Sequence, residues 1–228
     1  MGEPSRRIIF IDFGGVISTD EFWLSLRQDG HPLKARLDAG MEKIWHESPD
    51  ISRAWMRGEL SFGEVLTEMG IAGEGSDFLD QALQRDARRM RVHPGIAELL
   101  PAWAGSGAEL VLATDNAPQL AAAFEDARTQ GSRRAGPPAT MEDTAPWFSG
   151  TVCSCATGVL KAEDPARFFG PWLARRERGF SDALLVDDRA DNCEAFTRMG
   201  GAAVRWHLSD DVSRLAAPVT AWLAAAGE

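Results

Sequence analysis

The chain has 228 residues, 44% of them hydrophobic, which suits one core domain with room for an inserted subdomain. Its formal net charge of −10 argues against a nucleic-acid partner and against membrane-surface binding, because both need a basic surface. No apolar segment of signal-peptide type or of membrane-spanning length is present, so we expect a cytoplasmic protein without a membrane partner.

The first strong structural signal is the stretch IIFIDFGGVI, residues 8–17. Its apolar first half predicts a strand buried on both faces, as is typical of parallel sheets. Asp12 follows that strand directly, at the edge where open α/β sheets bind ligands. Gly14 and Gly15 then allow a sharp turn and a close approach of the backbone to whatever Asp12 contacts.

The chain then carries no convincing buried strand until after residue 91. Apolar residues recur instead at helical spacing in five segments, 21–28, 33–47, 51–60, 61–70 and 77–90. A Ser-x-x-Glu capping box opens the fourth of them. We therefore expect an all-helical subdomain over residues 18–91, inserted between the core segments 1–17 and 92–228.

The remaining chain alternates between apolar strands and amphipathic helices. Strands are predicted over residues 109–114, 147–154, 182–188 and 202–206. Helices are predicted over 94–107, 117–127, 164–178, 189–200 and 210–226, the last interrupted by Pro218. Residues 128–146 are rich in Gly, Pro, Ser and Thr and predict a long loop. This alternation indicates an α/β fold, a Rossmann-like parallel sheet flanked by helices.

The three cysteines, Cys153, Cys155 and Cys193, have no spacing that indicates a disulfide framework. The Cys-Ser-Cys of residues 153–155 is predicted to fall in a strand, where alternation places both thiols on one face. A metal-binding pair is one interpretation, and buried small hydrophobic residues are the simpler one.

Polar residues lie where these strands and one turn end, at Asp12, at Thr114 to Asn116, at Lys161, and at Asp187 with Asp188. Carboxylates are suitable ligands for Mg²⁺, and an Asp can also act as a covalent nucleophile. Lys161 supplies a cation for a phosphate group, and Thr114 supplies a hydroxyl donor. The pattern therefore favours phosphoryl chemistry at one edge of the sheet.

In this order, IIFIDFGGVI, LVLATDN, the lysine of GVLKAEDPARFF and LLVDDRADN resemble the four motifs of the haloacid dehalogenase-like (HAD) hydrolase superfamily. The predicted helical block sits where that superfamily carries its small helical cap. The DFGGV form resembles the C1 branch, which includes sugar-phosphate phosphatases. The resemblance implies a Mg²⁺-dependent phosphatase that hydrolyses a small phosphorylated metabolite through an aspartyl-phosphate.

The resemblance also implies a role for each residue. Asp12 is the nucleophile, and Thr114 and Lys161 orient and neutralise the phosphoryl oxygens. The implied metal ligands are Asp12, the carbonyl of Gly14, Asp187 and Asp188, and the implied substrate-binding residues are Gly14, Gly15 and Asn116.

One departure from the family pattern concerns the proton donor. Phosphatases of this superfamily usually carry a second Asp two residues after the nucleophile, as general acid and base, and here that position is Gly14. General acid–base help is typically worth about 10²–10⁴-fold. Asp20, His31 and His46 are the candidate substitutes, although each also suits a helix cap or the surface.

Two other functions stay open. A dehalogenase would use Asp12 to attack carbon without a metal, although the paired aspartates argue against it. A non-catalytic module that binds a phosphorylated ligand or a protein partner would explain Gly14. Trp23, Trp45 and Trp55 also fit such a module, but packing is the simpler interpretation of these residues.

Overall fold

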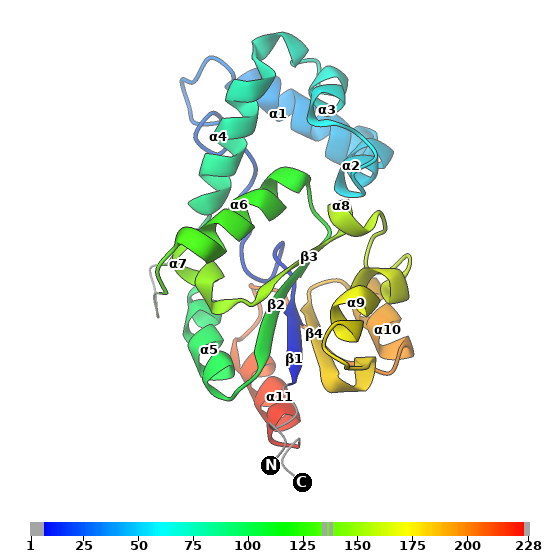
Figure 1. The fold of residues 1–228 in the computed structure, drawn as a ribbon. Helices are drawn as coiled ribbons and strands as arrows, with labels where there is room; N and C mark the ends of the chain where they lie inside the picture. Colours follow the sequence, from blue (N-terminus) through cyan, green and yellow to red (C-terminus); the bar gives the residue numbers. More distant parts are fainter. Residues whose placement is uncertain (1–6, 134–135, 137–138, 226–228) are drawn as a thin grey trace.

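The structure is a computed structural model that describes residues 7–133, 136 and 139–225. Five parallel strands form one sheet in the order β3-β2-β1-β4-β5 (Figure 1). Their bounds are β1 Ile8–Ile11, β2 Glu109–Thr114, β3 Gly150–Cys153, β4 Ala183–Asp187 and β5 Ala202–Arg205. The predicted α/β fold with a parallel sheet is confirmed.

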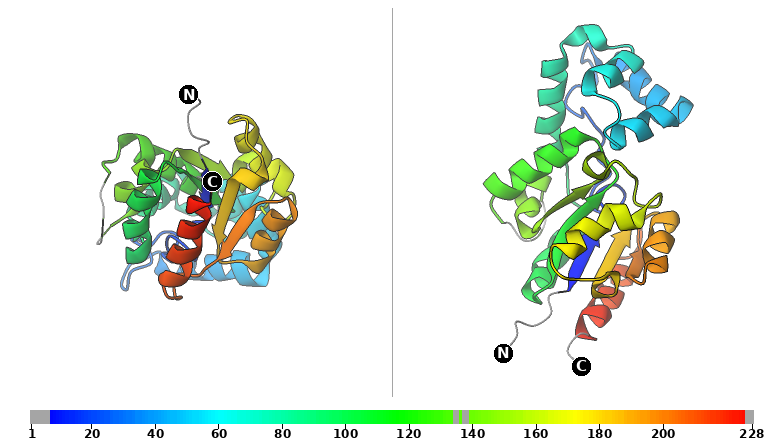
Figure 2. Two further views of the ribbon diagram at one scale, coloured as in Figure 1. Left: turned by 90° about the horizontal axis from the view of Figure 1, so that it is seen from below. Right: turned by 45° about the vertical axis from the view of Figure 1, so that its right-hand side comes forward.

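Helices cover both faces of the sheet, as the view from below shows (Figure 2). Ile9 and Ile11 of β1 pack toward one face, and Ile8 and Phe10 pack toward the other, all four fully buried. The first face is covered by α5 Pro94–Gly105, α6 Pro118–Gln130 and α11 Ser213–Ala224. The second face is covered by α9 Pro165–Ala174 and α10 Ala190–Arg198. Short connecting elements are α7 Met141–Thr144, η3 Ala145–Trp147, α8 Ser154–Thr157 and η4 Phe180–Asp182.

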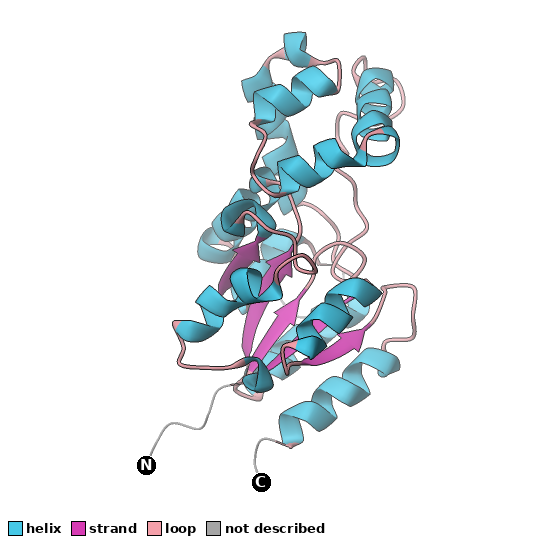
Figure 3. Ribbon diagram, turned by 90° about the vertical axis from the view of Figure 1, so that its right-hand side faces the viewer, coloured by secondary structure: helices cyan, strands magenta, loops and turns pink. Residues whose placement is uncertain are grey.

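A separate group of helices lies beyond the carboxyl ends of the strands, as Figures 1 and 3 show. We call it the helical lobe; it comprises α1 Lys34–Glu42, the π-helix η1 Lys43–Glu47, α2 Pro49–Met56, α3 Phe62–Glu68, η2 Ala72–Glu74 and α4 Ser76–Arg88. Trp23 and Trp55 are fully buried in it, with stacked rings whose centroids are 6.4 Å apart. Packing is therefore the role of these two tryptophans, and the predicted capping box at Ser61 is also present.

Two connections join the helical lobe to the sheet, and an ion pair ties them together. The Asp20 carboxylate accepts hydrogen bonds from the Arg91 backbone N–H at 2.7 Å and from the Arg91 guanidinium at 2.8 Å. No helix among the residues described here is long and apolar enough to cross a membrane.

Three predicted local features are wrong. Residues 21–28 form turns instead of a helix, because Trp23 inserts into the helical lobe with φ of 55° and donates its indole N–H to Leu79 O. The predicted loop 128–146 is partly helical, since α6 runs to Gln130 and α7 begins at Met141; residues 134–135 and 137–138 of that loop lie outside the described part. Helix α11 continues through Pro218. Proline has no backbone N–H, so the carbonyl four residues earlier has no helical donor, and water can hydrate it because this part of the helix is exposed.

The strand that was predicted to contain both Cys153 and Cys155 ends earlier than predicted. β3 stops at Cys153, and the chain turns into α8 at Ser154. Cys155 is therefore on a helix, and strand alternation does not place it.

Candidate active site

The strand ends bring the predicted polar residues to one edge of the sheet. Asp12 follows β1, Thr114 ends β2, and Asp187 ends β4. Because β1 lies between β2 and β4, these three residues are neighbours at the carboxyl edge. Lys161 reaches the same place from the turn that follows α8.

Lys161 is a buried cation, only 1% exposed, and not a surface lysine. Its Nζ lies 3.0 Å from Asp12 Oδ1 and 2.5 Å from Asp187 Oδ2, and it donates to Ala113 O at 3.2 Å. An ammonium has three N–H donors, so all three are used. Burial lowers the pKa of Lys161, but Asp12 and Asp187 outweigh that effect and raise it, so the side chain stays charged.

Asp187 is the most enclosed of the carboxylates, with 0% exposure. Besides Lys161, its oxygens accept from Asn192 Nδ2 at 3.0 Å and from the Arg189 backbone N–H at 3.0 Å. Asn192 is not among the site residues predicted from the sequence. The available signal is its place in the first turns of α10, which begins directly after the carboxylates of β4.

Asp12 and Asp188 complete the group of carboxylates. Burial raises the pKa of Asp12 to about 8, with Lys161 opposing the shift and Asp187 adding to it. Burial and the neighbouring Asp187 also raise the pKa of Asp188. One carboxylate oxygen from each of the three aspartates lies within 4.8 Å of the others. Among the described residues Lys161 is the one cation that forms an ion pair with any of these three aspartates, so three carboxylates with hard oxygen ligands fit a divalent ion such as Mg²⁺.

Thr114 carries a buried hydroxyl that has no hydrogen-bond partner among the described residues. Buried polar groups in native structures are nearly always paired, so an unpaired one calls for an explanation. A ligand oxygen bound beside Lys161 would provide the missing partner.

The two glycines after Asp12 differ in their surroundings. Gly15 has φ of 74°, and a Cβ there would lie 2.7 Å from Asp188 Oδ2, so a side chain would collide with the carboxylate. A Cβ on Gly14 would meet nothing within 4 Å. Position 14 therefore has room for the side chain that the family pattern places there.

Two cavities open above this edge, with volumes of about 550 and 510 Å³. Both are lined by Gly14, Trp45, Asn116 and Asp188. The smaller cavity is lined by Asp12 and, from the helical lobe, by Arg53 and Met56. The larger cavity extends along the helical lobe to Arg27, Glu42 and His46. Residues of the helical lobe thus form walls of the space in front of Asp12.

The candidate proton donors are placed unequally around these cavities. Asp20 lines the larger cavity, but hydrogen bonds from Arg91 outweigh the effect of burial and lower its pKa. His31 lines neither cavity, whereas His46 lines the larger one. His207, which the sequence analysis did not single out, also lines it, because it follows β5 at the same edge of the sheet.

No protein-family model matches the chain, and no curated protein matches it. Solved structures do match. A predicted HAD-like family hydrolase from Porphyromonas gingivalis is similar with a TM-score of 0.65 and 16% identity, over 95% of this chain and 98% of that one. A HAD family enzyme from Bacteroides thetaiotaomicron, solved as a magnesium complex, has a TM-score of 0.62 and 15% identity, over 92% and 98%. A 2-haloacid dehalogenase from Pseudomonas syringae pv. Tomato has a TM-score of 0.57 and 15% identity, over 95% and 99%. The chain therefore has the fold of HAD-family enzymes.

Proposed function

We propose that the protein is a Mg²⁺-dependent phosphatase that hydrolyses a small phosphorylated metabolite, sugar-phosphate-like in size, through an aspartyl-phosphate on Asp12. The observation that carries the proposal is the imbalance of charge at the strand ends, where one buried lysine faces three clustered carboxylates. A divalent cation and a phosphate dianion together fit this arrangement, since the cation offsets both.

Asp12 is suitably held for nucleophilic attack. Its Oδ1 accepts from the Phe13 backbone N–H at 2.7 Å and lies 3.0 Å from Lys161 Nζ. Among the described residues Oδ2 has no hydrogen-bond donor, so Oδ2 is the oxygen we assign to the attack on phosphorus. The bond from phosphorus to the leaving oxygen breaks, and the leaving oxygen takes a proton from solvent. Water then attacks the same phosphorus, the phosphorus bond to Asp12 breaks, and inorganic phosphate and the Asp12 carboxylate are released.

The other residues bind and neutralise the phosphoryl group. Thr114 donates its unpaired hydroxyl to one oxygen. The three N–H donors of Lys161 go to Asp12, Asp187 and Ala113 O, so Lys161 neutralises the phosphoryl group through its positive charge. The proposed metal ligands are Asp12, the Gly14 carbonyl, Asp187 and Asp188, and the proposed substrate-binding residues are Gly14, Gly15 and Asn116. When bound, Mg²⁺ supplies neutralisation of the charge that builds up on the phosphoryl oxygens.

The helical lobe is the proposed cap, residues 18–91, over the core segments 1–17 and 92–228. Its residues wall the two cavities, and a volume of about 550 Å³ suits a small metabolite. This arrangement and the DFGGV stretch support a place in the small-helical-cap (C1) branch. The Bacteroides thetaiotaomicron HAD family enzyme was also solved with magnesium and inorganic phosphate, in line with the chemistry proposed for Asp12.

The test is turnover of an aryl phosphate in the presence and absence of Mg²⁺, with Asp12→Asn as the inactive variant. The surface variant Asp29→Asn is the matched control, because it makes the same chemical change on an exposed loop. We expect turnover by the wild type and the control, and none from Asp12→Asn or in EDTA. Undiminished turnover by Asp12→Asn would remove the proposal.

A dehalogenase is the second candidate, because a 2-haloacid dehalogenase is among the similar structures. Such an enzyme would release halide from a small haloacid with no need for metal. Halide release that persists in EDTA would favour it over the phosphatase. Phosphate binding without any turnover across a broad panel of phosphate esters would instead favour a non-catalytic module.

A further inference from the structure

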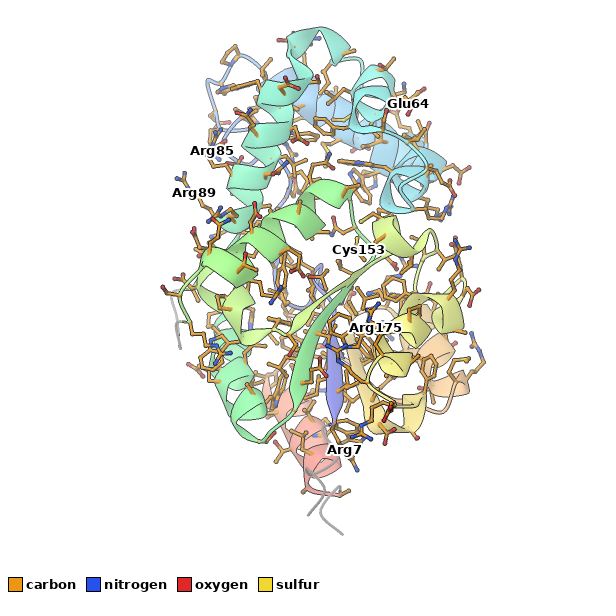
Figure 4. The ribbon with its side chains drawn as sticks, in the orientation of Figure 1. Arg7, Glu64, Arg85, Arg89, Cys153 and Arg175 are labelled. Carbon is orange, nitrogen blue, oxygen red and sulfur yellow. The ribbon has the colours of Figure 1, made fainter. Side chains whose placement is uncertain are left out.

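Two cysteines meet beside the proposed active site and take no part in the chemistry described so far. Cys153 ends β3, and Cys155 lies in the first turn of α8, so the strand-to-helix turn folds one back over the other. Their sulfur atoms are 2.6 Å apart. Figure 4 labels Cys153 at this junction, between the sheet and the helical lobe.

This turn is bonded directly to the loop that follows β2. Cys153 pairs with Thr114 in the sheet register, and its Sγ lies 3.2 Å from Asn116 O, to which the thiol can donate. The Asn116 backbone N–H donates to Ser154 Oγ at 3.1 Å. Ser154 Oγ in turn donates to Met56 O of the helical lobe at 2.7 Å. The Cys-Ser-Cys turn therefore connects the proposed phosphate-binding loop to the helical lobe.

The two thiols differ in access and in acidity. Cys153 is buried, whereas Cys155 is partly exposed. The hydrogen bond with Cys153 lowers the pKa of Cys155, and the same bond, together with burial, raises the pKa of Cys153. Cys155 is thus the thiol that solvent reaches and that deprotonates more readily, and Cys153 is the buried thiol that stays protonated. Cys193 is separate on α10, and burial raises its pKa to about 12.

We propose that Cys153 and Cys155 are a redox-sensitive pair that forms a reversible disulfide, and that this bond alters the Thr114–Asn116 loop. The oxidant is a small disulfide such as oxidised glutathione. The Cys155 thiolate attacks one of its sulfurs and releases one small thiol, which leaves a mixed disulfide. Cys153 loses its proton to solvent and attacks the Cys155 sulfur, which closes the protein disulfide and releases the second small thiol.

The short ring explains why the bond is reversible. A disulfide that spans only three residues removes little loop entropy from the unfolded chain, so it adds little to stability. Exposed or strained disulfides belong to the labile class that small thiols reduce. Cys153 has one S–H, which it donates to Asn116 O while Cys155 is protonated and to the Cys155 sulfur when that is a thiolate. In the oxidised form Cys153 has no S–H, so Asn116 O loses that donor and the adjacent loop loses one of its restraints.

The disulfide is tested by counting thiols and does not depend on the proposed function. The protein is incubated with oxidised glutathione, denatured, alkylated and mapped by mass spectrometry. We expect alkylation at three cysteines before oxidation, at Cys193 alone after it, and at all three again after dithiothreitol. Cys193→Ser should still form the Cys153–Cys155 crosslink, and Cys155→Ser should not. Three alkylated cysteines after oxidation, or glutathione retained on Cys155, would overturn the pair.

The effect on the loop rests on the proposed function and is tested by turnover of an aryl phosphate. We expect oxidation to lower turnover severalfold in the wild type and in Cys193→Ser, and to leave Cys155→Ser unchanged. A crosslinked protein with unchanged turnover would overturn the effect on the loop. If the reduced protein shows no turnover at all, the proposed function fails, while the thiol count still decides whether the pair exists.

Discussion

Gly14 offers a gain-of-function test of the proposed chemistry. The family resemblance places a general acid at this position, and a Cβ there meets nothing within 4 Å. In Gly14→Asp the new side chain would extend into the cavity of about 550 Å³, near Asn116 and Asp188. The neighbouring carboxylate would raise the pKa of the new Asp, which favours the protonated form that a general acid needs.

The size of the gain follows from the chemistry of the leaving group. General acid help is worth about 10²–10⁴-fold, and we expect the lower end, about 10²-fold or about 2.7 kcal/mol in the barrier, because the surrounding residues are not adapted to it. The gain should appear in kcat/KM for an alkyl phosphate, whose leaving group needs a proton. An aryl phosphate, whose leaving group is stable as an anion, should change little.

Two glycine variants make the test specific. Gly63→Asp, on α3, adds the same side chain in open space away from the cavities and should change neither substrate. Gly15→Asp should lose activity, because its Cβ would lie 2.7 Å from Asp188 Oδ2. A general-acid role at position 14 is refuted if Gly14→Asp has the wild-type melting temperature and still hydrolyses the alkyl phosphate at the wild-type rate.

Three further predictions concern the buried charges and the unpaired hydroxyl. Thr114→Val should leave the free energy of unfolding unchanged or raise it by about 1 kcal/mol, and weaken inorganic phosphate binding roughly 10-fold by calorimetry. Thr151→Val, which removes another buried unpaired hydroxyl, is its control and should bind phosphate normally. Lys161→Met should lower the free energy of unfolding in urea by about 3–5 kcal/mol, because it leaves Asp12 and Asp187 buried without their cation; an unchanged midpoint would contradict the assigned ion pairs. The stability of the metal-free protein should fall as the pH rises from about 4 toward about 8, because the folded protein keeps a proton on Asp12 that the unfolded chain releases. Mg²⁺ should therefore raise the melting temperature more at about pH 8 than at about pH 6, and an equal rise at both would contradict a metal that competes with the Asp12 proton.

The sheet and its polar edge could be predicted from sequence because both rest on local signals. Fully buried parallel strands are continuous apolar runs, and the run at Ile8–Ile11 ends directly on Asp12. In parallel strands the carboxyl ends meet at one edge, so Thr114 and Asp187 could be placed near Asp12 before any distance was known. Lys161 could be placed only through the family resemblance, because a lone lysine in a turn gives no sign that it is buried.

What could not be predicted depends on contacts between distant segments. Trp23 leaves the helical pattern because its indole hydrogen-bonds to Leu79, 56 residues away along the chain. His207 lines the larger cavity because β5 ends there, and a histidine after an edge strand carries no local sign of a site. The contact between Cys153 and Cys155 depends on where β3 ends, and element ends are the least predictable part of a pattern.

The central claim, that Asp12 attacks phosphorus, is tested most directly by mass spectrometry of the peptide that contains Asp12. The enzyme is mixed with Mg²⁺ and excess aryl phosphate in ¹⁸O-labelled water, quenched in acid during turnover and digested. We predict one phosphoryl group on Asp12, and ¹⁸O in the released phosphate but not in the Asp12 carboxylate, because water attacks phosphorus in the second step. Turnover without a phosphoryl group on Asp12, or ¹⁸O in its carboxylate, would contradict the claim.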